Sequence, residues 1–168
     1  MPELNNYTYE RLQKLVAVIF IGCLMVLFLS GFDTIKAKAR DIKRLADIKV
    51  LVKALDLYHD KYGKYPDSNN DWQGWDLSIG YNSGKVDFID RLKAEGFVDR
   101  EVKDPINDVA YHYRYQKFKA GDYGCKNSFY ILQIAGFELS SENNGRGECP
   151  ELNWVESATN GYTVQDFD

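Results

Sequence analysis

An uninterrupted apolar run near the N-terminus limits the possible folds of this chain more than any other feature. Residues 15–32 contain no charged side chain, and a helix of that length rises about 27 Å, close to the hydrocarbon thickness of a bilayer. A secretory signal peptide would have a shorter apolar core and then a cleavage site of small residues, whereas this run ends in Ser30-Gly31-Phe32. We therefore expect residues 15–32 to form a transmembrane helix that stays attached to the chain.

The apolar run continues directly into a basic, amphipathic segment, residues 33–62. Apolar residues recur there at spacings of three and four, the pattern of a helix that packs along one face. Gly63 suits the left-handed position after a helix and Pro66 cannot continue one, so we expect the helix to end beside them. The expected packing residues are Leu45, Ile48, Leu51, Val52, Leu55, Tyr58 and Tyr62. The basic residues expected on the opposite, solvated face are Lys43, Arg44, Lys49, Lys53 and Lys61.

The length of the chain sets the number of domains. Of its 168 residues, about 130 remain after the anchor, which is enough for one ordinary domain. A composition of 45% hydrophobic and 27% charged residues is typical of a folded chain. We expect a cytoplasmic stub at residues 1–14, then the anchor, then one domain at residues 33–168. That domain comprises the amphipathic helix, a connection at residues 63–108, and a sheet with C-terminal loops at residues 109–168.

The charge of the chain is distributed unevenly. Residues 33–64 hold nine Lys and Arg against five Asp and Glu, whereas residues 65–168 hold ten against eighteen. A nucleic-acid-binding domain usually concentrates positive charge on its globular part, so we expect no nucleic-acid partner. The basic segment is expected to be a solvated helix face close to the anionic headgroups of the bilayer.

The three cysteines differ in their surroundings. Cys23 lies inside the apolar run, where it is expected to act as a small apolar filler. Cys125 and Cys149 lie in the globular part and are expected to form a disulfide. A bridge that closes a loop of about 25 residues stabilises a fold by roughly 3 to 4 kcal/mol in the chain-entropy model. Because such a bond requires an oxidising compartment, it predicts that the domain lies outside the cytoplasm.

The basic residues that flank the apolar run favour the opposite orientation. Arg11 and Lys14 precede the run, whereas Lys36, Lys38, Arg40, Lys43 and Arg44 follow it. By the positive-inside rule alone, the domain would be cytoplasmic. We give more weight to the cysteine pair and expect a single-pass protein with a cytoplasmic N-terminus and an extracytoplasmic domain.

The connection at residues 63–108 is expected to be mostly irregular, with one short helix. It is rich in Gly, Asn, Asp and Ser, and Trp72 and Trp75 are its expected anchors. The short helix is expected just after Asp87, which can cap it, and Gly96 is expected to end it.

Alternating residues predict an antiparallel hairpin after residue 109. Residues 110–119 place Tyr111, Tyr113 and Tyr115 on one side of a strand, and residues 128–140 form a second strand rich in aromatic and branched residues. A short third strand is expected near Tyr162, Thr163 and Val164. The tyrosine face could be a stacking platform for single-stranded nucleic acid or sugar, but we expect it to pack against the amphipathic helix.

The sequence predicts no catalytic site. Its only histidines, His59 and His112, have no Ser or Cys partner at a recognisable spacing. Together with Cys125 and Cys149 they could in principle bind zinc, but no C-x-x-C motif is present, so we expect no zinc site.

Two segments resemble a known family. Lys36 to Pro66 (KAKARDIKRLADIKVLVKALDLYHDKYGKYP) and Phe88 to Asp108 (FIDRLKAEGFVDREVKDPIND) are similar to the helix and the short helix with its Asp-Pro turn in type IV pilin-like proteins, above all the major pseudopilin of type II secretion. The strand pair adds a weaker likeness, and together the segments cover roughly residues 15–140. The resemblance implies an α+β fold in which a long N-terminal helix packs on a small antiparallel sheet.

The resemblance also implies a function. Such proteins are non-enzymatic, membrane-anchored subunits of secretion, pilus or uptake machines and assemble with like subunits by helix packing. One departure matters: the family's precursors are cut between Gly and Phe just before the apolar run, and a Glu follows five residues into the mature helix. No Gly precedes Leu15, and Gly31-Phe32 follows the run. The alternative is a bitopic envelope protein that does not polymerise and uses the same head as a binding or scaffold module.

The resemblance further implies that calcium could bind in the loops of the domain. Asp67, Asn69 and Asp71 have the alternate spacing of a calcium loop, but Trp72 occupies the position of the required glycine. A second acidic group is formed by Glu138, Glu142, Asn143 and Glu148. We expect neither group to be a metal site and expect no cofactor.

Overall fold

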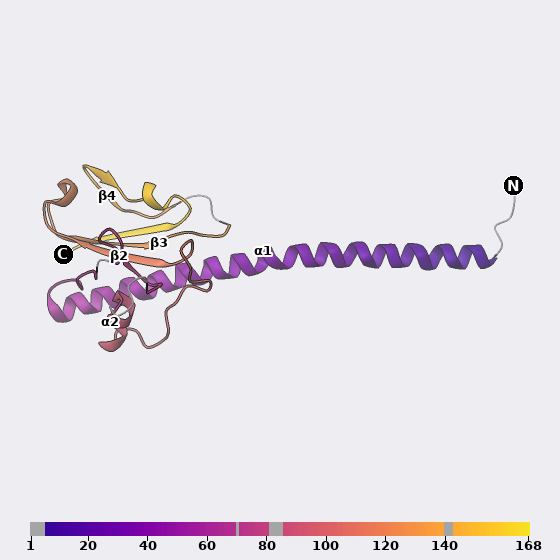
Figure 1. Ribbon diagram of the computed structural model, residues 1–168, viewed down its shortest axis with the longest axis horizontal. Helices are drawn as coiled ribbons and strands as arrows, with labels where there is room; N and C mark the ends of the chain where they lie inside the picture. Colours follow the sequence, from indigo (N-terminus) through magenta and orange to yellow (C-terminus); the bar gives the residue numbers. More distant parts are fainter. Residues whose placement is uncertain (1–5, 70, 81–85, 140–142) are drawn as a thin grey trace. The chain divides into compact units, whose positions relative to one another are not determined.

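The computed structural model describes residues 6–69, 71–80, 86–139 and 143–168 (Figure 1). The chain divides into two compact units, one ending at Ala39 and the other comprising Arg40–Asp168. Each is described on its own, and the second is called the head. The layout is α+β, with a long N-terminal helix and a small antiparallel sheet, as the sequence predicts.

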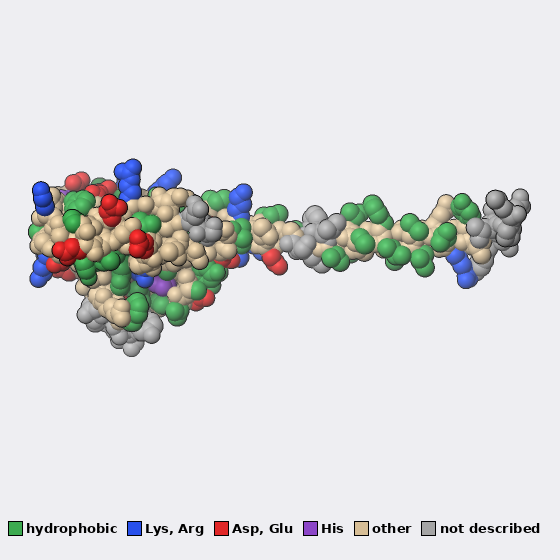
Figure 2. Space-filling model, turned by 90° about the horizontal axis from the view of Figure 1, so that it is seen from above, with side chains coloured by type: hydrophobic (Ala, Val, Ile, Leu, Met, Phe, Trp, Pro, Cys, Tyr) green, Lys and Arg blue, Asp and Glu red, His purple; other side chains and the backbone are tan. Residues whose placement is uncertain are grey.

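Helix α1 comprises Asn6–Tyr62, so it begins earlier than the apolar run. Side chains 8–26 of the first unit are all exposed, and Figure 2 shows hydrophobic side chains along this segment. The mean hydropathy reaches 2.8 in this helix, which is long and apolar enough to cross a membrane. A helix that is apolar on every side is typical of a membrane span.

The head contains the C-terminal part of α1, whose inner face enters the core. Ile48, Leu51 and Leu55 are at most 2% exposed. The helix ends where the sequence predicts: Gly63 has a φ of 66°, which favours glycine, and its N–H donates to the His59 carbonyl oxygen at 2.7 Å.

The predicted hairpin is the centre of a four-stranded antiparallel sheet with the order β1-β2-β3-β6. Strand β2 (Tyr113–Phe118) pairs with β3 (Phe129–Ile134), and Tyr115 lies opposite Leu132. The expected third strand is β6 (Tyr162–Phe167), which is longer than predicted and pairs with the other side of β3. All residues of β3 are buried, because the strand is central and an apolar cluster covers each face of the sheet.

Two short features are not predicted by the sequence. Strand β1 (Asp76–Leu77) pairs with β2 at the sheet edge, within the connection that was expected to be irregular. A separate two-stranded sheet is formed by β4 (Glu148–Cys149) and β5 (Leu152–Asn153). Two residues per strand give little periodicity, which is why neither pattern is visible in the sequence.

The short helix of the connection agrees with its prediction. Helix α2 comprises Phe88–Ala94 and is capped by Asp87, which accepts a hydrogen bond from Asp90 N at 2.8 Å. Of the two expected tryptophan anchors, Trp75 is buried, whereas Trp72 is 47% exposed. The remaining helical turns are the 3-10 segments η1 (Asp122–Gly124) and η2 (Glu156–Ala158).

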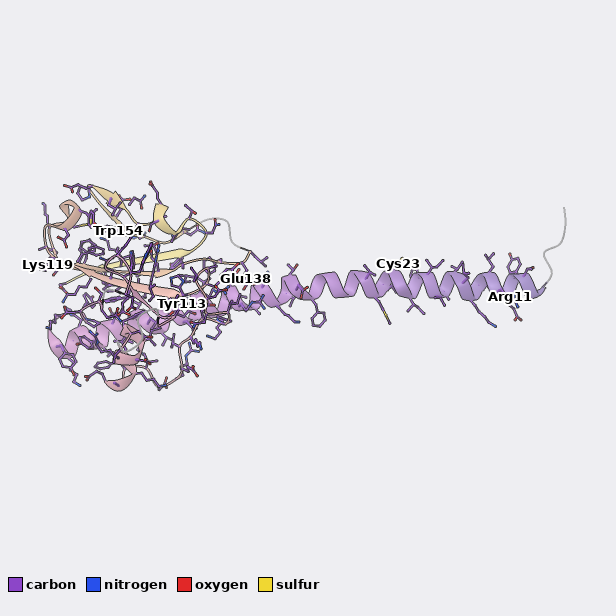
Figure 3. All side chains as sticks on the ribbon, in the orientation of Figure 1. Arg11, Cys23, Tyr113, Lys119, Glu138 and Trp154 are labelled. Atoms are coloured by element: carbon purple, nitrogen blue, oxygen red, sulfur yellow. A yellow bond between two sulfur atoms is a disulfide. The ribbon has the colours of Figure 1, made fainter. Side chains whose placement is uncertain are left out.

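The sheet of the head separates two apolar clusters. Tyr113 and Tyr115 belong to the cluster on the α1 side, as predicted, whereas Tyr111 precedes β2 and is half-buried. The opposite face, called the outer face below, packs against Trp154 and the disulfide. Figure 3 shows Tyr113 on the α1 side of the sheet and Trp154 on the other side.

Candidate assembly helix and its buried ionic cluster

The structure divides the predicted packing residues of α1 into three groups. Ile48, Leu51 and Leu55 are buried, and Val52 and Tyr58 are half-buried. Tyr62 is 41% exposed, but its ring lies 4.5 Å from that of Tyr58. The prediction that Leu45 packs in the core is wrong, because this side chain is 39% exposed. The reason lies one turn before Ile48, where Arg44 rather than Leu45 points inward and is fully buried. The prediction that Arg44 lies on the solvated face is therefore also wrong.

The outward face of α1 in the head combines apolar and basic side chains. Ile42 is 59% exposed, and Leu45 and Leu57 are each 39% exposed. Lys49 and Lys53 are exposed between them. The five residues Ile42, Leu45, Lys49, Lys53 and Leu57 are called the outward stripe below.

Arg44 contacts three carboxylates inside the head. Its Nε and Nη2 donate to the two oxygens of Asp104, at 2.7 and 3.1 Å, which is the bidentate geometry of a strong ion pair. Its Nη1 donates to Asp41 Oδ1 at 2.6 Å and to Glu138 Oε1 at 2.9 Å. These four residues together with Arg40 are called the Arg44 cluster.

Arg40 and two backbone groups complete the Arg44 cluster. Arg40 donates to both oxygens of Glu138, at 2.7 and 2.5 Å. Asp41 accepts hydrogen bonds from the backbone N–H groups of Glu138 and Leu139, each at 3.0 Å. The cluster therefore joins α1 to the segment that follows β3.

The pKa values of three groups in the Arg44 cluster, Glu138, Arg44 and Asp104, favour their charged forms. Hydrogen bonds from Arg40 and Arg44 lower the pKa of the Glu138 carboxyl to about 2. Burial alone would lower the pKa of Arg44, but its hydrogen bonds to Asp104 and Glu138 raise it above the ordinary value. Burial alone would raise the pKa of Asp104, but the hydrogen bond from Arg44 lowers it. Each charge is thus stabilised by its partners.

A second buried carboxylate lies one turn further along α1. Asp47 is fully buried and accepts hydrogen bonds from Lys43 at 2.5 Å, Arg100 at 2.8 Å and the Tyr113 hydroxyl at 2.9 Å. Burial and the charge of Asp47 raise the pKa of Tyr113, so its hydroxyl stays protonated and donates. Because these charged atoms are already paired with one another, the arrangement supports a structural role, holding α1 to the sheet and to the connection.

The sequence contained a signal for these buried charges. Asp41, Arg44, Ile48, Leu51 and Leu55 recur at spacings of three and four and therefore share one helix face. The buried positions of α1 therefore keep the helical spacing even where the residue is charged. Residue type alone placed Arg44 on the wrong face.

Several members of the two acidic groups considered for calcium make contacts elsewhere. Asp71 Oδ2 accepts a hydrogen bond from Leu77 N at 3.0 Å, and Asp67 pairs with Lys117 at 3.2 Å. Glu138 belongs to the Arg44 cluster, while the Asn143 amide donates to the Ala158 carbonyl oxygen at 2.8 Å. Glu142 lies outside the described residues. Among the residues that the structure describes, no group of three or more His, Cys, Asp or Glu side chains is placed to hold a metal ion.

The predicted disulfide is present, and the histidines are apart from it. Cys125 and Cys149 are bonded, with their Cα atoms 5.2 Å apart, and Cys23 is a free, exposed cysteine. His59 lies 3.5 Å from Asp168. His112 is 7% exposed, and its Nδ1 lies 3.2 Å from the Asp108 carbonyl oxygen. Bonded cysteines are not zinc ligands, since metal binding requires the thiolate.

Comparisons with known proteins give no match. No protein-family model, no curated protein and no solved structure matches the chain. We therefore infer the function from the residues and contacts described above.

Proposed function

We propose that the chain is a membrane-anchored, pilin-like structural subunit that assembles with like subunits through α1. The observation that supports this most is that the two parts of α1 expose different surfaces. Its N-terminal part exposes apolar side chains on all sides, and its part in the head uses one face for the core and leaves the outward stripe exposed. The α+β layout agrees with the fold that the pilin-like resemblance implies.

Charge gives the outward stripe a suitable partner. Lys49 and Lys53 interrupt its apolar residues, while residues 65–168 carry eighteen acidic side chains against ten basic ones. The basic side chains of the stripe on one copy are therefore complementary to the net negative charge of residues 65–168 on the next, which favours association. The Arg44 cluster serves this function by holding the head to the helix that makes the contacts.

Site-specific crosslinking tests the proposal. A photo-crosslinking amino acid at Ile42, in the full chain expressed in membranes, is expected to give covalent dimers and larger species. The matched control is the same amino acid at Lys126, an exposed loop residue of the head, which should give far fewer. If Ile42 gives no crosslink between copies while the protein is folded and membrane-bound, assembly through the outward stripe is wrong.

The alternative, a bitopic protein that does not polymerise, is favoured by one observation. Gly31 and Phe32 lie inside α1, so cutting there would separate the apolar segment from the head. Mass spectrometry of the N-terminus of the membrane-purified protein separates the two functions. A trimmed, methylated N-terminus contradicts the alternative, and an intact Met1 together with no assemblies contradicts the proposed subunit.

We further propose that the head is extracytoplasmic. The Cys125–Cys149 disulfide supports this orientation. Labelling with a membrane-impermeant thiol reagent in intact cells, with and without prior reduction, checks it. Free thiols at these positions that react only from the cytoplasmic side would contradict it.

A further inference from the structure

The outer face of the sheet carries a cavity that none of the roles above uses. It has a volume of about 500 Å³, within the size range of small-molecule sites. Apolar side chains form most of its lining, among them Leu77, Val109 and Ala135, and Trp72 lies at its edge, 47% exposed. Its charged or titratable groups are His112, just before β2, and Arg114, within β2. These two residues are two positions apart and face the same side of the sheet.

Arg114 is a cation without a carboxylate partner in the described part of the chain. Its Nε donates to Gln133 Oε1 at 2.7 Å, and its Nη2 donates to the Ser157 carbonyl oxygen at 3.0 Å and to Ser157 Oγ at 3.4 Å. Its guanidinium carbon lies 4.5 Å from the Trp75 ring centroid. No Asp or Glu that the structure describes lies within 4.0 Å of it, and no described acceptor contacts Nη1. Burial lowers the pKa of Arg114, which shows the cost of an uncompensated charge at this position.

His112 makes the cavity sensitive to an anion. Its Nδ1 faces the Asp108 carbonyl oxygen, so Nδ1 carries the proton and Nε2 can accept a hydrogen bond. Burial and the positive charge of Arg114 lower the pKa of His112. The backbone carbonyl oxygens of Asp108 and Val109 and the charge of Asp104 raise it, but by less, so the net shift is downward. The ring is therefore neutral at pH 7, and a negative charge beside Arg114 would raise its pKa.

We propose that this cavity binds a small apolar carboxylate, with the carboxylate group on the free N–H groups of Arg114 and the apolar group against Leu77, Val109 and Trp72. One cation without a carboxylate partner matches a single negative charge, and a guanidinium N–H forms a strong, charge-assisted hydrogen bond with a carboxylate oxygen. The apolar lining excludes a highly hydrated anion such as free phosphate. The same chemistry is presented by a free short-chain acid and by the C-terminus of an apolar peptide.

Titration of the full chain in a non-ionic detergent tests the proposal. The probes are hexanoate, hexanamide, and a short peptide ending in leucine with either a free or an amidated C-terminus. Hexanoate or the free-acid peptide is expected to bind saturably and to raise the pKa of His112, followed by NMR of the imidazole protons. Tighter binding of hexanoate points to a free acid, and tighter binding of the peptide points to a chain terminus.

Variants identify the group that binds. Arg114→Met is expected to weaken binding at least tenfold, which corresponds to about 1.4 kcal/mol. Arg114→Lys is expected to weaken it several-fold, because a lysine ammonium cannot keep the contacts to Gln133 and Ser157 and also donate to the ligand from a planar, positioned group. The matched control is Lys119→Met, which removes an exposed cation just after β2 and should leave binding unchanged. Equal binding of the acid and amide probes overturns the proposal. So does saturable binding that survives both Arg114 substitutions, or no binding of either acid to the folded protein.

Discussion

The two faces of the sheet each contain an arginine, fully buried Arg44 and half-buried Arg114, and these two side chains have opposite kinds of partner. On the α1 side, Arg44 is fully buried and contacts Asp41, Asp104 and Glu138. On the outer face, Arg114 stacks on Trp75 and has no described carboxylate within reach. A compensated charge is part of the scaffold, whereas an uncompensated charge beside a cavity is available to a ligand.

Asp76, at the sheet edge, resembles Arg114 but carries the opposite charge. It is fully buried, and among the described residues no Lys, Arg or His lies within 4.0 Å of its carboxylate; its oxygens accept hydrogen bonds from Asn69 N at 3.3 Å and Phe88 N at 3.2 Å. Asp76 lies opposite Tyr115, and Leu77 lies opposite Arg114. Because successive strand residues point to opposite faces, Asp76 and Arg114 cannot neutralise each other.

Removing the guanidinium of Arg44 should give the largest effect. Arg44→Met leaves three carboxylates without their shared partner, and breaking a buried ion pair in this way costs about 3 to 5 kcal/mol. Urea unfolding of the full chain in non-ionic detergent, followed by tryptophan fluorescence of the head, measures the change. In Arg40→Met, whose side chain is 32% exposed, the loss should be much smaller, because solvent screens a partly exposed ion pair. Similar losses in both variants would show that the Arg44 cluster does not hold α1 in place.

The outer face should depend more on its disulfide than on its charges. Replacing Cys125 and Cys149 by serine removes the constraint on the unfolded chain and should lower the free energy of unfolding by roughly 3 kcal/mol. Cys23→Ser, in the apolar segment, is the control and should leave the unfolding of the head unchanged. If reducing agent leaves the midpoint of the wild-type head unchanged although both thiols become free, the outer face is held by packing alone.

The sequence could predict those parts of the molecule that depend on residues close together in the chain. The hairpin, the cap at Asp87 and the end of α1 at Gly63 depend on neighbouring residues, so local patterns predicted them. Two of the three partners of Arg44, Asp104 and Glu138, lie 60 and 94 positions away, and no local pattern connects such distant charges. The cavity joins Trp72, Val109 and Ala135 from separate segments, and its shape depends on the unpredicted strand β1. The disulfide was predictable only because the domain offered just two cysteines.

Asp76→Asn should change the pH dependence of stability. Burial, with Asp87 and Asp71 nearby, raises the pKa of the Asp76 carboxyl to about 7, against about 3.9 in an unfolded chain. Between these values the folded protein binds more protons than the unfolded chain, so the free energy of unfolding falls as the pH rises. Asp76→Asn should remove a decline of about 2 kcal/mol between about pH 5 and pH 7, which is 1.36 kcal/mol per pKa unit reduced by partial titration at both ends. Asp67→Asn, at an exposed position, should keep the wild-type slope; an unchanged slope in Asp76→Asn would contradict the assignment.

The smallest effect is expected from Arg114→Met, which is the counterpart of Arg44→Met on the outer face. Arg114→Met removes a desolvated, uncompensated charge, which stabilises the head, but it also leaves buried Gln133 Oε1 without its donor, which costs about 1 to 3 kcal/mol. The two terms oppose each other, so the net change should be within about 1 kcal/mol, and Met can still cover Trp75. The same urea unfolding measures it beside Arg44→Met. Should Arg114→Met destabilise the head as much as Arg44→Met, then Arg114 is part of the scaffold, and the contrast between a structural and a ligand-binding arginine fails.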